Sequence, residues 1–235
     1  MSNSPISQED ARDLLGSRRA APTSAALQTG NLIVVSAPSG SGKSSMVERV
    51  LKRVDRLRYS ISYTTRSPRG AEKDGVHYYF RTKSEFVAMR DKGEFLEFAE
   101  VHGNLYGTHK DTVQELQAQG FDVILDIDVQ GARQICRQMS SAITVFILPP
   151  SRDVLAARLR LRNLNDPADL ERRLRDAAEE VRSYNQFSYV VVNEDLDRAS
   201  AALEAIINAE RHRRQPQEKM VSAIIGTFRG ESIHA

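Results

Sequence analysis

The chain has 235 residues, of which 40% are hydrophobic and 27% are charged, and its formal net charge is +2. These values are ordinary for a folded protein and exclude a wholly disordered chain. The charge is too small to indicate a nucleic-acid partner or a membrane surface by itself. Cys136 is the single cysteine, which excludes an intramolecular disulfide and a cysteine-rich zinc site. With neither a signal-peptide pattern nor a long apolar run, we expect a cytoplasmic protein without a membrane partner.

The chain starts with a segment, residues 1–29, that is rich in serine, alanine and arginine and carries two prolines. This composition is typical of a flexible leader. Residues 31–36 then form a short β-branched run that predicts a buried strand. After a Gly-Ser loop, apolar residues recur at helical spacing from Met46 to Val54 and predict an amphipathic helix.

Three further apolar runs predict central parallel strands, and amphipathic patterns between them predict helices. The strands are expected at 121–127, 142–148 and 189–192, and the helices at 130–139, 151–162, 168–186 and 196–212. Strands that alternate with helices indicate βαβ units and a parallel sheet covered on both faces. The predicted fold class is therefore α/β, with a parallel sheet core flanked by helices.

Residues 59–110 break this alternation, because polar and aromatic residues alternate there around one short helix near 84–92. A capping box is predicted for that helix, from Thr82 to Glu85. We therefore expect a strand-rich subdomain inserted into the core. The expected division is a core of 30–58 and 111–212, an insertion at 59–110, and a C-terminal tail at 213–235 that extends along the surface.

A glycine-rich loop joins the first predicted strand to the first predicted helix, in the P-loop pattern. It reads Ala37-Pro38-Ser39-Gly40-Ser41-Gly42-Lys43-Ser44, followed by Ser45, with alanine at a position where the usual pattern has glycine. Backbone N–H groups and the helix N-terminus of such a loop surround phosphate oxygens. Lys43 is expected to reach the β- and γ-phosphates and Ser44 to hold Mg²⁺, largely through water and phosphates. The loop predicts a nucleoside triphosphate site and leaves the acceptor open.

Two carboxylates lie at the end of the predicted strand 121–127. Asp126 interrupts an apolar run, where a buried charge costs free energy and therefore suggests a function, and Asp128 follows just beyond. The carboxyl ends of parallel strands face the crevice where α/β sheets bind ligands. Asp126 is therefore a candidate for the acidic residue that accompanies a P-loop.

Four segments in and beyond the insertion carry a family resemblance. They are Ser-Tyr-Thr-Thr-Arg-Ser-Pro-Arg at 62–69, Glu-Phe-Leu-Glu-Phe at 94–98, Asn-Leu-Tyr-Gly-Thr at 104–108 and Leu-Asp-Ile-Asp-Val-Gln-Gly at 125–131. In this order and at this spacing the chain resembles the guanylate kinases, from about residue 31 to about residue 211. The resemblance implies a P-loop kinase that transfers a phosphoryl group from ATP to GMP with Mg²⁺, in purine nucleotide metabolism.

The resemblance also implies which residues hold GMP. Its phosphate is expected to contact Arg66, Arg69, Tyr78 and Tyr106, and its guanine Ser62, Glu97, Thr108 and Asp128. The chemistry agrees, since guanidinium forks bind a phosphate dianion bidentately. A carboxylate can accept from guanine N1–H and the 2-amino group together, whereas adenine offers neither donor. Glu97 is thus expected to select the base.

An arginine-rich stretch follows Pro150. Acidic residues interleave with the arginines and no stacking aromatics lie among them, which disfavours a nucleic-acid surface. This region, here about 151–170, resembles the helical lid over ATP of the guanylate kinases. Arg158, Arg162 and Arg173 match lid arginines, and Asn193 matches a position near the adenine. The chain departs from the family pattern after Arg162, where a glycine that is often present is missing.

Two other functions are left open by the residues themselves. One is a P-loop kinase for another small phosphorylated acceptor, which would not need Glu97, Ser62 and Thr108 together. The other is a non-catalytic module that binds proteins, which would be favoured by a damaged P-loop or missing lid arginines. Lys43, Ser44, Arg158 and Arg173 are all present, so an enzyme is expected. Its partners would be ATP and GMP, and a homo-oligomer is possible.

Overall fold

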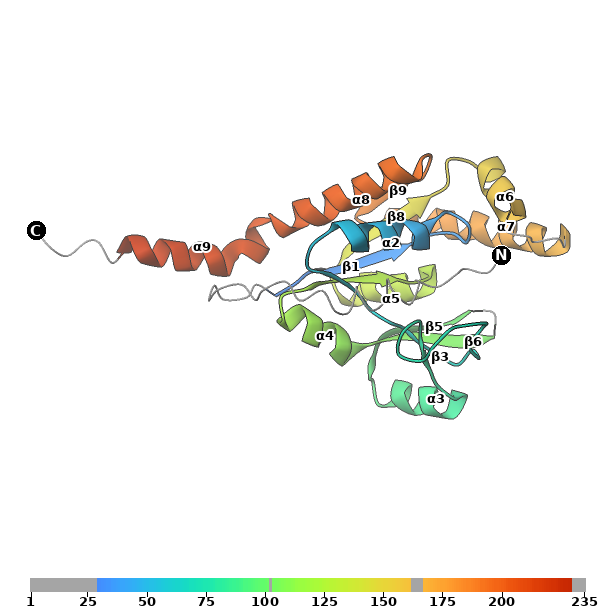
Figure 1. Cartoon of the computed structure of the whole chain (residues 1–235), viewed down its shortest axis with the longest axis horizontal. Coiled ribbons are helices and arrows are strands. Elements are labelled where there is room, and N and C mark those ends of the chain that lie inside the picture. Colours follow the sequence, from blue (N-terminus) through green and yellow to red (C-terminus); the bar gives the residue numbers. More distant parts are fainter. Residues whose placement is uncertain (1–28, 102, 162–166, 230–235) are drawn as a thin grey trace, which may run out of the picture.

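The computed structural model describes residues 29–101, 103–161 and 167–229 (Figure 1). Except for Thr29, the predicted leader lies outside these residues, and so does Arg162. No helix in the described ranges is both long enough and apolar enough to cross a membrane.

A five-stranded sheet forms the centre of the molecule, in the order β2-β7-β1-β8-β9. All neighbouring strands are parallel. Its strands are β1 (Leu32–Ser36), β2 (Leu57–Tyr59), β7 (Asp122–Asp126), β8 (Ile143–Leu148) and β9 (Tyr189–Val192). The β-branched run of β1 is wholly buried, because β1 lies between β7 and β8 and is covered on both faces.

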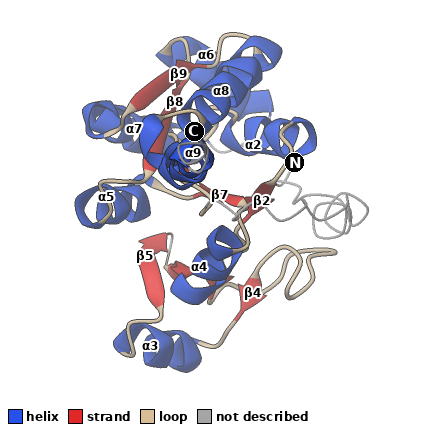
Figure 2. Cartoon of the chain, turned by 90° about the vertical axis from the view of Figure 1, so that its left-hand side faces the viewer, coloured by secondary structure: helices blue, strands red, loops and turns tan. Residues whose placement is uncertain are grey.

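Helices cover both faces of this sheet (Figure 2). Alternate side chains of β1 point to opposite faces, so Ile33 and Val35 join one hydrophobic cluster and Leu32 and Val34 the other. The first cluster includes residues of α2 (Lys43–Arg53) and α8 (Leu196–Arg211), and the second residues of α4 (Lys110–Ala118) and α5 (Val129–Gln138). The predicted α/β class is thereby confirmed.

The core has one more strand than the sequence predicts. β2 is an edge strand of three residues that pairs only with β7, from Leu57↔Asp122 to Tyr59↔Ile124. Such a short strand leaves no periodic pattern in the sequence. Tyr59, which the sequence assigned to the insertion, is the last residue of this core strand.

A second, four-stranded sheet follows the order β4-β3-β6-β5 and lies below the core in Figure 1. Its strands are β3 (Tyr63–Thr64), β4 (Tyr79–Phe80), β5 (Phe95–Val101) and β6 (Asn104–His109), with α3 (Lys83–Asp91) packed on it. Thr82 and Glu85 form the predicted capping box at the start of α3. Phe86 of α3 stacks on Phe95 of β5, with ring centroids 4.5 Å apart, and joins the helix to the sheet.

Among the described residues, three helices lie between β8 and β9 in the sequence. They are α6 (Arg152–Leu161), α7 (Pro167–Val181) and the short 3-10 helix η1 (Arg182–Gln186). Leu155 and Leu159 of α6 pack with Leu170 and Leu174 of α7 in a cluster separate from the two core clusters. This pair of helices is therefore a small unit of its own, as a lid requires.

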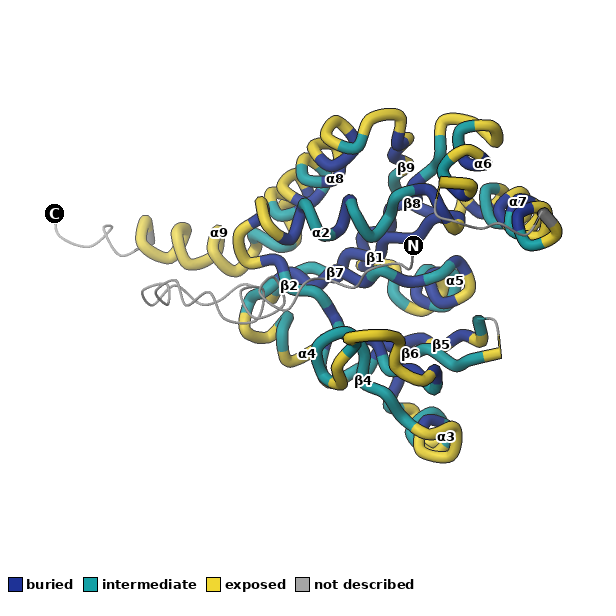
Figure 3. Tube along the Cα trace, turned by 45° about the vertical axis from the view of Figure 1, so that its right-hand side comes forward, coloured by how far each residue is buried: buried dark blue, intermediate teal, exposed yellow. Residues whose placement is uncertain are grey.

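The C-terminal tail, expected as a surface extension, contains a helix. This helix, α9 (Arg214–Arg229), follows α8 after two residues and projects away from the body (Figures 1 and 3).

Candidate active site

The phosphate loop lies between β1 and α2, at the carboxyl edge of the central strand. Gly40 and Gly42 have φ angles of 91° and 89°, in the left-handed region that favours glycine. The N–H of Ser41 donates to Pro38 O at 3.1 Å and tightens the turn. Ala37 is buried and its φ is not positive, so a methyl group fits there without backbone strain. The departure at Ala37 therefore leaves the loop intact.

Lys43 points from the start of α2 to the end of β7. Its ammonium lies 2.5 Å from Asp126 Oδ1 and donates to Ile127 O at 2.6 Å. The half-buried Ser44 follows it in the first turn of the helix. Serine and aspartate offer the hard oxygen donors that Mg²⁺ prefers, and Mg²⁺ usually takes few protein ligands beside phosphates and water. The described residues contain no cluster of three or more acidic, histidine or cysteine side chains that could hold a metal alone.

A buried carboxylate lies on β5 of the second sheet. Glu97 is 3% exposed, and Thr108 of β6 donates to its Oε1 at 2.6 Å. Burial raises the pKa of Glu97 to about 7, and the negative charge of Asp128 adds to this, while the Thr108 hydrogen bond opposes it. Asp128 caps α5, where its Oδ1 accepts from Gln130 N at 2.6 Å and Gly131 N at 3.0 Å. Two carboxylates and Thr108 thus lie close together, and Ser62, which directly precedes β3, is also buried.

The arginine at position 66 is held in a buried network. Glu72 accepts from both terminal nitrogens of Arg66, at 2.8 and 3.0 Å, and from Arg69 N at 2.7 Å. Burial raises the pKa of Glu72, but the hydrogen bonds from Arg66 and Arg69 outweigh it, so the pKa is lowered. The Arg66 guanidinium lies 5.2 Å from the centre of the Tyr78 ring, a cation–π distance. This network fixes the direction of the Arg66 guanidinium in the protein without a bound ligand.

Tyrosine hydroxyls surround the same cation. Tyr78 and Tyr106 meet edge to face, with centroids 6.0 Å apart, and Tyr106 shares a hydrogen bond with Arg66. Burial, together with the neighbouring phenol of Tyr106, raises the pKa of Tyr78 to about 12, so this phenol stays a hydrogen-bond donor. Arg69 is exposed beside this group. The four residues expected to bind phosphate therefore fall in one region of the second sheet.

Two residues of this site were not predicted from the sequence. Glu72 orients Arg66, and Gly131 leaves the space that the Glu97 carboxylate occupies, since a Cβ there would lie 2.2 Å from Glu97 Oε2. Glu72 lies in an irregular loop with no periodicity, so only its spacing from the arginines could have indicated it. Gly131 lies in a helix, where a glycine costs about 1 kcal/mol relative to alanine and so asks for a packing reason.

The lid arginines differ in their surroundings. Arg158 donates from Nη2 to Asn193 O at 2.9 Å, while its Nη1 is buried and has no partner among the described residues. Asn193 in turn donates from Nδ2 to Ser41 O of the phosphate loop at 2.7 Å. Arg173 pairs with Asp169 at 3.0 Å within α7. A connected path therefore runs from the phosphate loop through Asn193 to a lid arginine with a spare donor.

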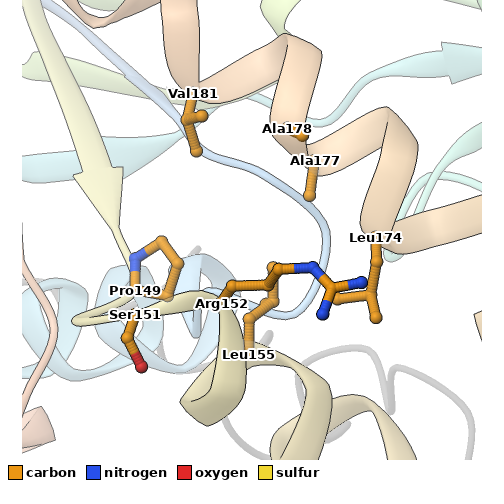
Figure 4. Close-up of a pocket in the computed structure, with 8 residues that line it drawn as sticks. All are labelled: Pro149, Ser151, Arg152, Leu155, Leu174, Ala177, Ala178 and Val181. Atoms are coloured by element: carbon orange, nitrogen blue, oxygen red, sulfur yellow. The ribbon is translucent and has the colours of Figure 1, made fainter. Parts of the chain in front are cut away.

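A separate cavity of about 270 Å³ lies between α6 and α7 (Figure 4). Its lining is mostly apolar, from Pro149, Leu155, Leu174, Ala177, Ala178 and Val181, with Ser151 and Arg152 at its edge. Such a lining offers few partners for phosphate or for a nucleobase. This cavity is therefore a poor candidate for the substrate site.

A P-loop at the carboxyl edge of a parallel sheet, facing an inserted sheet with a prearranged arginine, defines a P-loop kinase. The family model described as guanylate kinase matches residues 29–210. Guanylate kinases from Alkalilimnicola ehrlichii and Vibrio cholerae are 46% and 44% identical over 201 and 204 residues, each covering 86% of this chain and 99% of that protein. A crystal structure of guanylate kinase from Anaplasma phagocytophilum matches with a TM-score of 0.66 at 32% identity, covering 79% of this chain and 88% of that one. The chain therefore belongs to the guanylate kinase family.

Proposed function

We propose that this protein transfers the γ-phosphoryl group of ATP to GMP, giving ADP and GDP. The observation that carries the proposal is the buried Glu97 carboxylate, which Thr108 holds in place and which lies close enough to Lys43 of the phosphate loop to feel its charge. Among the described residues Thr108 donates a hydrogen bond to this carboxylate, while the neighbouring Asp128 repels it, so the burial of Glu97 is not explained by its neighbours, and guanine supplies the missing donors.

ATP would bind through the loop 37–45. Its phosphates would take the backbone N–H groups of the loop, and Lys43 would exchange part of its contact with Asp126 for phosphate oxygens. Ser44 would hold Mg²⁺, with Asp126 acting through water, and the bound ion would neutralise charge on the phosphates. Asn193 would keep the loop in shape through Ser41 O.

GMP would bind on the second sheet. Arg66, Arg69, Tyr78 and Tyr106 would hold its phosphate, and the bond between Arg66 and Glu72 would set the direction of the guanidinium fork. Glu97, with Ser62, Thr108 and Asp128 around it, would accept from N1–H and the 2-amino group of guanine. AMP offers no such donors, so its binding would leave the carboxylate unpaired.

The transfer needs positioning and charge neutralisation more than proton transfer, because the attacking group is itself a phosphate oxygen. That oxygen forms a bond to the γ-phosphorus of ATP while the bond to the β–γ bridging oxygen breaks and ADP leaves. Arg158 has a buried Nη1 ready to donate to the moving group. Arg173 and Arg162 would join it from the lid, Arg173 after leaving Asp169.

The same proposal includes the division of the chain and its location. We divide it into a core of 30–59 and 111–212, a GMP-binding insertion of 60–110, a lid at about 151–170 and a tail from 213, with the first boundary placed after Tyr59 because β2 ends there. The separate hydrophobic cluster of α6 and α7 supports an independent lid. A kinase that consumes ATP and GMP works where these nucleotides are kept, so we place it in the cytoplasm.

The test is ATP-dependent phosphorylation of GMP, AMP, CMP and UMP in parallel, with Mg²⁺, for the wild type, Glu97→Ala and Glu100→Ala. Glu100 lies on the same strand but is exposed, which makes it a matched control. We expect turnover of GMP that Glu97→Ala lowers by at least about a hundredfold and Glu100→Ala leaves unchanged. No turnover of any nucleotide would overturn the kinase proposal, and turnover of another acceptor would overturn its guanine site.

A further inference from the structure

The helix α9 carries a stripe of large apolar side chains that are exposed. Exposed fractions are 46% for Met220, 39% for Val221, 49% for Ile224, 47% for Ile225 and 71% for Phe228. Their spacing, at about 100° per residue, places them on one face about 140° wide. None of the hydrophobic clusters formed by the described residues includes a side chain of this helix. Figure 3 shows α9 as exposed along nearly its whole length.

Such a helix needs a packing partner to be stable. Isolated helices shorter than about 12–15 residues are marginal in water even when alanine-rich. α9 has 16 residues, but from Val221 onward it contains the β-branched Val221, Ile224 and Ile225, and also Gly226, which all lower helix propensity. Its side-chain hydrogen bonds, such as Gln217 to Arg211 O and Thr227 to Ile224 O, are local. The stability of the helix must therefore come from burying the stripe.

The opposite face of α9 argues against a lipid surface as the partner. From Glu218 onward, the positions outside the stripe carry the charged residues Glu218, Lys219 and Arg229 beside the small residues Ser222, Ala223 and Gly226, so the charges are of both signs and sum to +1. Helices that lie in a membrane interface instead have a strongly charged polar face, rich in lysine and arginine. A nearly neutral, small-residue outer face fits a helix that packs against protein.

The exposed area matches what a pair of such helices needs. If a large side chain has a surface area of roughly 200 Å², the exposed fractions of the five stripe residues add up to an exposed apolar area of about 500 Å². Two copies packed face to face would bury about 1,000 Å² in all, the size at which specific interfaces begin, before the flanking residues are added. The stripe is thus large enough for a second copy of itself, and it is as large as the largest apolar patch of a typical monomer.

We propose that α9 is a homodimerisation helix, and that two copies pack their stripes antiparallel about a two-fold axis. A two-fold pair uses the same patch on both subunits, as a single self-complementary stripe requires. The antiparallel arrangement opposes the helix dipoles, keeps the exposed Arg213 and Arg214 of the two subunits apart, and places the two catalytic bodies at opposite ends. The stripe from 220 to 228 then centres on Ile224.

The mass in solution tests the dimer. Sedimentation velocity of the full chain should give a species of twice 26.3 kDa for the wild type and 26.3 kDa for Ile224→Ser/Phe228→Ser. The control Ser222→Lys, on the opposite face, should stay dimeric. Phosphotransfer activity per chain should persist in the monomeric variant, since α9 contributes no residue to the site, and this reports that the body is folded.

Three results would overturn the proposal. One is a wild type that is monomeric at about 100 μM, well above the Kd of a micromolar dimer. Another is a stripe variant that remains dimeric, because the interface would then lie elsewhere. A third is a monomeric wild type that co-sediments with vesicles of anionic phospholipid, which would assign the stripe to a membrane.

Disulfide trapping tests the orientation in a Cys136→Ser background. An antiparallel pair centred on residue 224 brings the two copies of that position together, so Ile224→Cys should cross-link with itself. Met220→Cys should not, because its two copies would lie about 12 Å apart along the axis, beyond disulfide reach. Self-cross-linking of Met220→Cys would show a parallel pair and contradict the proposed arrangement.

Discussion

Gly131 faces the carboxylate of Glu97 so closely that a Cβ at position 131 would lie 2.2 Å from Glu97 Oε2. The same glycine donates its N–H to Asp128 Oδ1 at 3.0 Å. One residue in the first turn of α5 therefore positions both carboxylates that we assign to guanine. No side chain larger than hydrogen fits there unless Glu97 moves.

Gly131→Ala should displace Glu97 and weaken GMP binding. We expect the KM for GMP to rise at least about tenfold, equivalent to about 1.4 kcal/mol, while the KM for ATP stays unchanged. Steady-state kinetics with each substrate varied in turn makes the comparison. The double variant Gly131→Ala/Glu97→Asp, with a shorter carboxylate, should recover the thermal stability lost in the single variant. An unchanged KM for GMP in Gly131→Ala would show that the close approach has no role in binding.

The pH dependence of GMP binding should reveal the raised pKa of Glu97. Only the ionised carboxylate accepts from both guanine donors, and its pKa is about 7 in the free protein. As pH falls from about 8 to about 5.5, the Kd for GMP should rise, by up to about tenfold per unit below the pKa. Calorimetry across this range measures it. Glu97→Gln is the control. The phosphate of GMP still titrates in that variant, so the slope of its Kd against pH must be subtracted from the slope of the wild type.

The same group should also affect folding stability without ligand. Because its folded pKa is raised, Glu97 contributes stability below its unfolded pKa of about 4.5, and this is lost as pH rises through about 7. The loss is on the order of 3 kcal/mol. Urea unfolding at about pH 5 and about pH 8 should therefore show a smaller decline for Glu97→Gln than for the wild type. An equal decline in both proteins would mean that Glu97 titrates normally.

The parts of the fold that could be predicted are those with a long, regular pattern. β1, β7, β8 and β9 are apolar runs, and α5 to α8 show apolar residues at helical spacing. β2 has three residues and α4 buries only Val113, so neither leaves a clear pattern. The stripe of α9 is regular in the sequence, but its meaning depends on its position outside the body, which only the structure shows.

The candidate active site likewise has a part that could be predicted from a local pattern and a part that could not. The phosphate loop is a local motif, whose chemistry follows from adjacent residues. The residues for GMP followed from a family resemblance, because they lie on separate strands and no local pattern joins them. Glu72 was missed because it acts through Arg66, six residues away, at a spacing that belongs to no regular element. Gly131 was missed because it acts through Glu97, which is distant in the sequence. Pairwise packing of this kind needs coordinates.

Glu72→Gln tests whether Arg66 must be held in place. The amide keeps the size of Glu72 but removes the charge, so the two-pronged hydrogen bond to Arg66 is weakened and the guanidinium gains freedom. We expect the KM for GMP to rise about tenfold with a smaller change in kcat, as for lost ground-state binding. Glu100→Gln, an exposed exchange on β5, should have no effect. If Glu72→Gln and Glu100→Gln behave alike, Glu72 is not a positioning residue.

Asn193 should matter for ATP and not for GMP. The side-chain amide of Asn193 donates to Ser41 O at 2.7 Å, and its backbone carbonyl accepts from Arg158 at 2.9 Å. Asn193→Ala removes the first hydrogen bond. It also opens space beside Gly42, because a Cβ at position 42 would lie 2.4 Å from Asn193 Nδ2. The loop should loosen, and the KM for ATP should rise about tenfold at a constant Kd for GMP. Asn193→Asp should be worse, because a carboxylate would face the Ser41 carbonyl, while Glu194→Ala next to it should be silent. Equal losses for ATP and GMP would instead indicate a general loss of folding, which a melting curve would detect.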